Sequence, residues 1–157
     1  MEKEPMSLYT IRFSDCDPFG HLNNGRYIDY FLNAREDHLR DHYGIELNEW
    51  AKRGIGFVVN RHDIRYLRPA GYNERVAIRS ALIGWTDTEL HVELQMWDEP
   101  LRQLKAIVWT SFTRVNAATG RKEAHTQETI EFVRWALLEG GPEGLDERIA
   151  ALRTANA

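Results

Sequence analysis

Residues 12–31 read RFSDCDPFGHLNNGRYIDYF, and this stretch joins the first expected strand to the first expected helix. Within it, Asp17, Pro18 and Gly20 hold the first, second and fourth positions of DPFG, a pattern typical of a type I turn. Just before the turn, apolar and polar residues alternate over residues 9–13, which predicts a strand with one buried face. A strand, a tight turn and a helix are therefore expected to follow one another at the start of the chain.

The helix after the turn is marked by apolar residues at helical spacing, and we expect it over residues 24–43, about five turns. Asn23 or Asn24 can cap its start, and Gly44 can end it. One stripe of this helix carries most of its large side chains, which are expected to pack in the core: Tyr27, Tyr30, Phe31, Ala34, His38 and Leu39.

The rest of the chain is dominated by four long segments rich in β-branched and aromatic residues, separated by turn signals: 57–67, 74–85, 89–97 and 104–116. Their short connections favour antiparallel pairing. A short helix is expected around residues 48–52, a closing helix over 126–138, and a weak helix in the tail, 142–157. This order predicts an α+β fold in which one long helix covers one face of a five-stranded sheet and leaves the other to solvent or a partner.

The composition indicates one globular domain, since the chain has 157 residues of which 43% are apolar. A net charge of −4 without any run of lysines or arginines argues against nucleic acid as a partner. No apolar run approaches the ~20 residues that a membrane-spanning helix needs. The charged first residues, MEKEPMS, lack the apolar centre of a signal peptide, so we expect a cytoplasmic protein.

The loop after the first strand also has the parts of an active site. A helix start offers unpaired amides and a partial positive charge, here from Asn24, Gly25 and Arg26. Such amides can polarise a carbonyl while a nearby carboxylate, Asp17, activates water or attacks directly. Structural roles remain open at this point, because an aspartate that begins a turn often accepts hydrogen bonds from its own backbone, and Asn23 suits a helix cap.

Two other chemistries fit this loop less well. Cys16 is a poor nucleophile, because the flanking aspartates disfavour its thiolate, and as the only cysteine it cannot form an internal disulfide. Asp15, Asp17 and His21 lack a recognised metal-ligand spacing, so no metal is expected. Dinucleotide, phosphate-loop and Gly-x-Ser-x-Gly motifs are also missing from the sequence.

The stretch DCDPFGHLNNGRYIDYF resembles the signature Asp-x-Asp-x-x-Gly-His-hydrophobic-Asn-Asn-x-x-Tyr of hotdog-fold acyl-CoA thioesterases in the 4-hydroxybenzoyl-CoA thioesterase-like family. GFVVNRHDIRYLRPAGYNERVAIRS, residues 56–80, is similar to a second block of that family, and FTRVNAATGRKEA, residues 112–124, is weakly similar to its last hairpin. The resemblance implies a hotdog fold: a long central helix wrapped by a curved antiparallel sheet. We expect a single hotdog domain over residues 1–140 and a helical tail over 141–157.

The resemblance also implies roles for individual residues. By motif position, Asp17 is the catalytic carboxylate, as general base or nucleophile, and the amide near Asn24 polarises the thioester carbonyl. His21 and Asn23 fall where the family has orienting or water-binding groups. The residues expected to contact the substrate, some of them from a second subunit, are Gly25, Tyr27, Val58, Val59 and Asn60. No cofactor is implied, because coenzyme A is part of the substrate, and self-association as a dimer or tetramer is expected.

Two alternatives to thioester hydrolysis stay open. A hotdog-fold enoyl-CoA hydratase is one, although the spacing between Asp17 and His21 departs from the hydratase pattern. A domain that binds acyl-CoA without turning it over is the other. The acyl group, its carrier (CoA or acyl carrier protein) and the basic residues that hold the CoA phosphates are not determined by these motifs.

Overall fold

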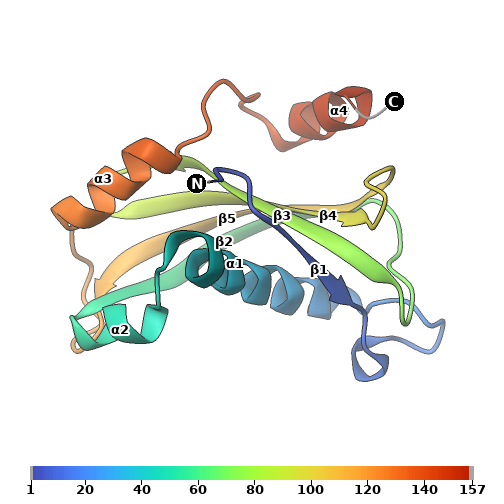
Figure 1. Ribbon diagram of the computed structural model, residues 1–157, viewed down its shortest axis with the longest axis horizontal. Coiled ribbons are helices and arrows are strands. Elements are labelled where there is room, and N and C mark those ends of the chain that lie inside the picture. Colours follow the sequence, from blue (N-terminus) through green and yellow to red (C-terminus); the bar gives the residue numbers. More distant parts are fainter. Residues whose placement is uncertain (1, 156–157) are drawn as a thin grey trace.

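The computed structural model describes residues 2–155 and contains one curved antiparallel sheet with helices on both sides (Figure 1). The strand order is β1-β3-β4-β5-β2, so β1 and β2 form the two edges. The strands are β1 Met6–Thr10, β2 Ile55–Tyr66, β3 Arg75–Trp85, β4 Glu89–Asp98 and β5 Leu104–Asn116. The four long strands and their antiparallel pairing confirm the prediction. Short connections account for the β3–β4 and β4–β5 pairs, because they cannot cross over to a parallel neighbour, whereas β2 pairs with β5 at the far edge.

The predicted long helix begins with a 3-10 turn, η2 Asn24–Arg26, and continues as α1 Tyr27–Tyr43 across one face of the sheet (Figure 1). Gly44 ends it in the left-handed conformation at φ 66, where its N–H reaches the Arg40 carbonyl. Tyr27, Phe31 and Ala34 are at most 2% exposed and pack against inward-facing side chains of the sheet. This interface is the main core, and the hotdog fold expected from the resemblance is confirmed.

The first strand lies three residues earlier in the chain than expected. Alternation over residues 9–13 predicted a strand there, but β1 ends at Thr10 and residues 13–15 form a 3-10 turn, η1 Phe13–Asp15. Bonding to the chain before β3 continues at Ile11, whose N–H donates to the Glu74 carbonyl at 2.9 Å, and the next N–H, that of Arg12, donates to the Tyr30 hydroxyl at 3.0 Å. Phe13 consequently points outward and is 77% exposed. The alternation of apolar and polar residues could not indicate that the Tyr30 hydroxyl accepts from the chain at this point.

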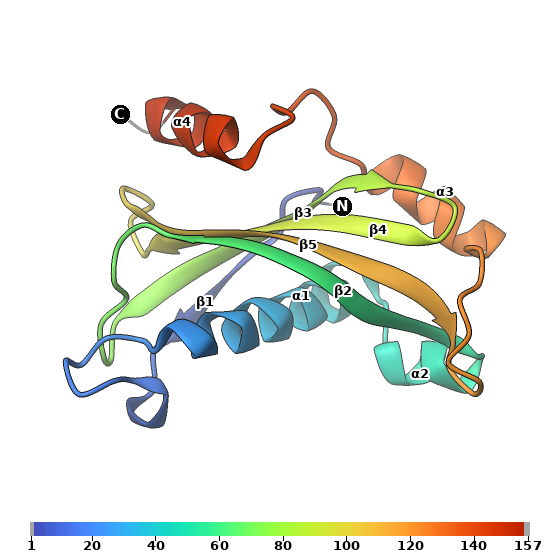
Figure 2. The same cartoon turned by 180° about the vertical axis from the view of Figure 1, so that it is seen from behind.

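The second face of the sheet is partly covered by the chain itself, which corrects the expectation that it faces solvent or a partner. A short helix, α2 Leu47–Lys52, lies on the same side of the sheet as α1, whereas α3 Gln127–Ala136 packs at one end of the sheet. The tail helix, α4 Leu145–Ala155, lies on the side opposite α1 (Figure 2). Its Leu145 and Ile149 pack against Ile107 of β5. None of the helices within residues 2–155 is long and apolar enough to cross a membrane.

Candidate active site

The loop between β1 and α1 closes on itself as a miniature hairpin. Cys16 and Leu22 form an antiparallel bridge, and the Asp17 N–H donates to the His21 carbonyl at 2.8 Å. Inside this hairpin the Gly20 N–H donates to the Asp17 carbonyl at 3.0 Å, which is the hydrogen bond expected of the predicted turn. Gly20 has a φ of 75, a conformation that glycine adopts without strain. The turn is therefore rigidly built around Asp17.

The Asp17 carboxylate has one engaged oxygen and one open oxygen. Its Oδ1 accepts from the N–H groups of Phe19, at 2.9 Å, and His21, at 3.1 Å. Its Oδ2 receives no hydrogen bond from any residue in the described range 2–155, and the side chain is only partly buried. Two amide hydrogens fix the orientation of the carboxylate, so the second oxygen is held in place and available to a ligand.

A distant segment of chain pins this hairpin in position. The Leu22 N–H donates to the Ala70 carbonyl at 2.8 Å, and the Tyr72 N–H donates to the Gly20 carbonyl at 2.7 Å. His21 forms an isolated bridge with Gly71 between these two bonds. The two sequence blocks that carried the resemblance thus lie side by side, although some 50 residues separate them.

The amides at the helix start are not equally available. The Asn23 side chain caps the helix by accepting from the Gly25 N–H at 3.0 Å, and the Asn23 carbonyl accepts from the Arg26 N–H at 2.8 Å. The Asn24 N–H has no acceptor anywhere in residues 2–155. Of the three amides predicted as donors, those of Gly25 and Arg26 are therefore occupied, and that of Asn24 remains free. Gly25 itself is exposed and its missing side chain would face mainly the Asn23 carboxamide.

Two tyrosines in contact with each other, one from β2 and one from α1, hold the backbone around this helix start. The Tyr66 hydroxyl, at the end of β2, donates to the Asn24 carbonyl at 2.9 Å. Its ring meets the Tyr27 ring edge to face, with 5.1 Å between centroids. Tyr27 is 2% exposed and its hydroxyl accepts from the Ala70 N–H, while burial raises the pKa of its phenol. Tyr27 thus packs in the core and orients the neighbouring backbone, and Tyr66 was missed by sequence reasoning.

Asp15 makes contacts that differ from those of Asp17. The Tyr30 hydroxyl donates to Asp15 Oδ2 at 2.6 Å, and this pair lines an open cleft beside β1 and α1. Burial, and then the hydrogen bond to Asp15, raise the pKa of Tyr30 to about 12, so the phenol stays protonated. Asp15 ends a 3-10 turn, whereas Asp17 begins the hairpin turn, so the two carboxylates lie in different local conformations. Their hydrogen-bond partners distinguish the two carboxylates: Asp15 accepts from a tyrosine hydroxyl, and Asp17 accepts from two backbone amides.

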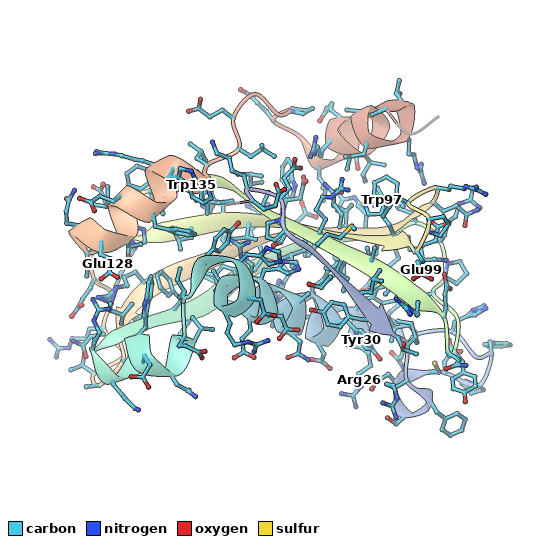
Figure 3. All side chains as sticks on the ribbon, viewed as in Figure 1. Arg26, Tyr30, Trp97, Glu99, Glu128 and Trp135 are labelled. Atoms are coloured by element: carbon cyan, nitrogen blue, oxygen red, sulfur yellow. The ribbon has the colours of Figure 1, made fainter. Side chains whose placement is uncertain are left out.

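The remaining loop residues have clear environments. Burial raises the pKa of the Cys16 thiol, and the charges of Asp15 and Asp17 raise it further, so a thiolate is disfavoured as expected. The His21 ring is exposed and makes no hydrogen bond within the described range. Figure 3 shows Arg26 and Tyr30 at this end of the molecule, whereas Glu128 and Trp135 lie at the other.

The three predicted contact residues on β2 lie away from the loop. Val58 and Val59 are 50% and 38% exposed on the edge strand, and Asn60 donates to the Thr113 hydroxyl beside a break in the register. Seven residues separate Val59 from Tyr66, or about 23 Å of extended strand. Within one chain the structure therefore does not bring Val58, Val59 and Asn60 to Asp17.

An apolar cavity of about 430 Å³ runs beside α1, between that helix, α2 and the inner face of the sheet. Its walls include Leu32, Trp50, Val59 and Phe112. The spacing of apolar residues in α1 predicted which side chains are buried, but it could not predict a cavity beside the helix. A larger open cleft of about 1380 Å³ lies on the opposite face beneath the α3–α4 connection, and its lining contains no residue of the loop before α1.

Several solved structures share this fold. The hypothetical protein TT1821 of Thermus thermophilus aligns with a TM-score of 0.77 and 20% identity over 87% of this chain and 99% of that chain. A DHNA-CoA thioesterase of Staphylococcus aureus aligns with a TM-score of 0.74 and 16% identity over 98% of this chain and 95% of that chain. YbaW, a probable thioesterase of Escherichia coli, aligns with a TM-score of 0.72 and 25% identity over 85% of this chain and 98% of that chain.

Sequence comparison agrees with these structural likenesses. The acyl-acyl carrier protein thioesterase ATL3, chloroplastic, of Arabidopsis thaliana is 23% identical over 104 residues, which are 63% of this chain and 54% of that protein. The chain thus spans about half the length of this curated relative. A family profile described as the thioesterase-like superfamily matches residues 11–147, from just after β1 into α4. By this match over most of its length, the chain belongs to the thioesterase-like superfamily.

Proposed function

We propose that this protein hydrolyses a thioester between an acyl group and coenzyme A or acyl carrier protein, releasing the free acid and the thiol. One observation carries the proposal. The loop before α1 leaves one Asp17 oxygen and the Asn24 N–H without partners in the described chain, while it engages the neighbouring donors and acceptors. An oriented carboxylate and a free amide at a helix start are the two groups that acyl transfer to water requires.

In the proposed reaction the thioester carbonyl oxygen accepts a hydrogen bond from the Asn24 N–H. As general base, Asp17 takes a proton from water, whose oxygen attacks the carbonyl carbon. The resulting oxyanion is stabilised by the Asn24 amide and by the partial positive charge of the helix start. The intermediate then expels the thiolate, which receives the proton from Asp17. Attack by Asp17 itself would instead form a mixed anhydride that water hydrolyses to the same products.

The site is proposed to be completed by a second copy of the chain. β2 is a twelve-residue edge strand, and two exposed valines, Val58 and Val59, lie along it. An unpaired edge of this length is a template for pairing with another strand. Antiparallel self-pairing of β2 would bring the partner's Val58, Val59 and Asn60 opposite the second half of this strand, which ends at Tyr66 beside Asn24. Their separation from Asp17 within one chain supports this assignment.

A panel of acyl-CoA substrates with a thiol-trapping dye tests the proposal. We expect thiol release by the wild-type protein and a loss of roughly 10²–10⁴-fold in kcat for Asp17→Asn. The amide retains an Oδ1 that can accept from Phe19 and His21, so the turn should persist. Asp29→Asn is the matched control, because Asp29 is an exposed carboxylate on the first turn of α1, paired with Arg26.

Three outcomes distinguish the candidates. Unchanged turnover by Asp17→Asn would contradict the proposed role of Asp17. Loss of absorbance at the enoyl band without free thiol would identify a hydratase. Tight binding of acyl-CoA without thiol release over hours would identify a binding domain.

A further inference from the structure

Arg35 of α1 is a buried cation without a carboxylate partner. It is 7% exposed, donates a 2.7 Å hydrogen bond to the Ser80 hydroxyl and lies 5.9 Å from the centre of the Tyr43 ring. The other two basic residues buried to a similar degree are neutralised: Lys105 pairs with Glu74 at 3.1 Å and Arg114 with Glu123 at 3.4 Å. Arg35 is the exception among the described residues, and burial of an unpaired charge is costly.

The groups around Arg35 do not supply the missing negative charge. His38 is fully buried, its Nδ1 lies 2.7 Å from the Ser80 hydroxyl, and its Nε2 has no partner within residues 2–155. Burial, and then the charge of Arg35, lower the pKa of His38 to about 4, so the ring is neutral. Asp37, on the same helix, is engaged by Tyr9 and Arg40. His38 is therefore left with one unused ring nitrogen, and the Arg35 charge is left without a carboxylate.

Arg35 also forms part of the wall of the apolar cavity beside α1. The acidic residue in that wall is Glu36, which is exposed and makes no ion pair with Arg35. Most of the other lining residues are apolar, among them Leu32, Leu39 and Trp50. A hydrocarbon chain fits such a wall, and one fixed cation within it favours a ligand that brings one negative charge.

The distance along α1 between Asn24 and Arg35 determines how long the acyl chain of that ligand must be. Eleven residues separate Asn24, the proposed donor to the thioester carbonyl, from Arg35, which is about 16 Å along a helix. Leu32 lies between them and lines the same cavity. An extended acyl chain of medium length spans this distance.

We infer that the cavity binds the acyl part of a thioester whose far end carries a carboxylate, with Arg35 as the partner of that carboxylate. This inference rests on the proposed function and specifies its substrate class: the monothioester of a dicarboxylic acid. Ser80 and Tyr43 interact with the guanidinium, which has five N–H donors, so further donors remain for the carboxylate. The ligand would supply the counter-ion that the described chain lacks.

A matched pair of substrates tests the inference, dodecanoyl-CoA and the CoA monothioester of dodecanedioic acid. They have the same chain length and differ only in the terminal carboxylate. We expect the wild-type protein to favour the dicarboxylic thioester in kcat/KM by roughly 10- to 100-fold, the range for hydrogen bonds to charged groups. Arg35→Met should abolish or reverse this preference. Arg40→Met is the control, since Arg40 is an exposed arginine on the same helix.

Two further measurements separate a binding role from a structural one. Calorimetric titration with free dodecanedioic acid and free dodecanoic acid measures binding without turnover. Dodecanedioic acid should bind more tightly to wild type than to Arg35→Met, and dodecanoic acid should bind equally to both. In thermal unfolding without ligand, Arg35→Met should be at least as stable as wild type, because it removes an uncompensated buried charge. A lower melting temperature together with unchanged chain preference would show that Arg35 is structural and would overturn the inference.

The two proposals can fail separately. Equal hydrolysis of both thioesters would overturn the carboxylate site and leave the proposed thioesterase intact. No hydrolysis of any acyl-CoA would overturn the proposed function, and the titrations with free acids would still decide the site. Weak binding of both acids, as expected if a second subunit fills the cavity, would also overturn the inference.

Discussion

At the scale of single residues, Asp17 has the structural role in the turn and is also free for the proposed chemical role, the two alternatives that its sequence context left open. One carboxylate oxygen orders the turn by accepting from Phe19 and His21, and the other is unbonded within the described residues. The same division occurs at the helix start, where Asn23 occupies the Gly25 amide and leaves that of Asn24 free. A turn signal and a catalytic signal in one residue are therefore compatible, because a carboxylate has two oxygens.

Substitution of Asp17 should separate these two roles. Asp17→Ala removes the acceptor of both amides and should lower the free energy of unfolding by about 1–2 kcal/mol relative to Asp17→Asn. Both variants should lose turnover to a similar extent, since both lack the carboxylate. Urea unfolding with parallel thiol-release assays measures this, and equal stability of the two variants would contradict the structural role of Oδ1.

His38 should make stability depend on pH. Its folded-state pKa is about 4 against an ordinary value of 6.5, so the unfolded state binds more protons between these values. The free energy of unfolding should therefore rise as pH increases from about 4 to 6.5, by about 3 kcal/mol from this group, and then level off. Urea unfolding at a series of pH values should show a smaller rise for His38→Gln. His42→Gln, with an exposed ring beside His38, should keep most of the rise, because burial is the largest cause of the lowered His38 pKa. Equal pH dependence of His38→Gln and wild type would contradict the assignment.

At the scale of elements, α4 is held to the sheet by a buried ion pair that no sequence pattern indicated. Glu93 of β4 is 1% exposed and accepts from Arg148 of α4, with a shortest distance of 2.9 Å, and from Trp109 at 2.9 Å. The prediction had only a weak tail helix there, because its periodicity is poor. The partner that stabilises this helix lies 55 residues earlier in the chain.

Substitution of Arg148 should show how much its ion pair with Glu93 contributes to the free energy of unfolding. Arg148→Met leaves Glu93 buried without its cation and should lower the free energy of unfolding by about 3–5 kcal/mol. The double variant with Glu93→Gln should recover much of the loss, because no uncompensated charge remains. Arg153→Met is the control on the same helix, where the side chain is exposed. Denaturant unfolding measures all four proteins, and a double variant no more stable than Arg148→Met would contradict a dominant charge penalty.

At the scale of the whole molecule, the two edge strands of the sheet determine where a second copy of the chain can pair. α1 covers one face of the sheet and α4 part of the other, so the long β2 edge is the natural place for extension of the sheet. The other edge, β1, is only five residues long. The proposed site would then have contributions from two chains.

A charge on this edge should disrupt both assembly and activity. Val58→Lys places an ammonium on β2, and we expect it to shift the protein from dimer to monomer with at least a tenfold loss of thiol release, because the partner's β2 no longer completes the site. Leu8→Lys is the matched control on β1, where the leucine is 42% exposed. Analytical ultracentrifugation with the acyl-CoA assay measures both effects. A fully active monomer would contradict completion of the site by a partner.

The sequence by itself determined the elements of this protein and their order. Apolar spacing of 3.6 or 2 residues, the turn at Asp17–Gly20 and the αL glycine at Gly44 are local features, so they could be recognised without a structure. Only the tertiary structure decided that the Tyr66 hydroxyl holds the Asn24 carbonyl, that Arg35 is buried without a carboxylate, and that α4 docks through Glu93. These depend on contacts such as Tyr66 with Asn24, between residues far apart in the chain, and no local pattern encodes the partner of a side chain.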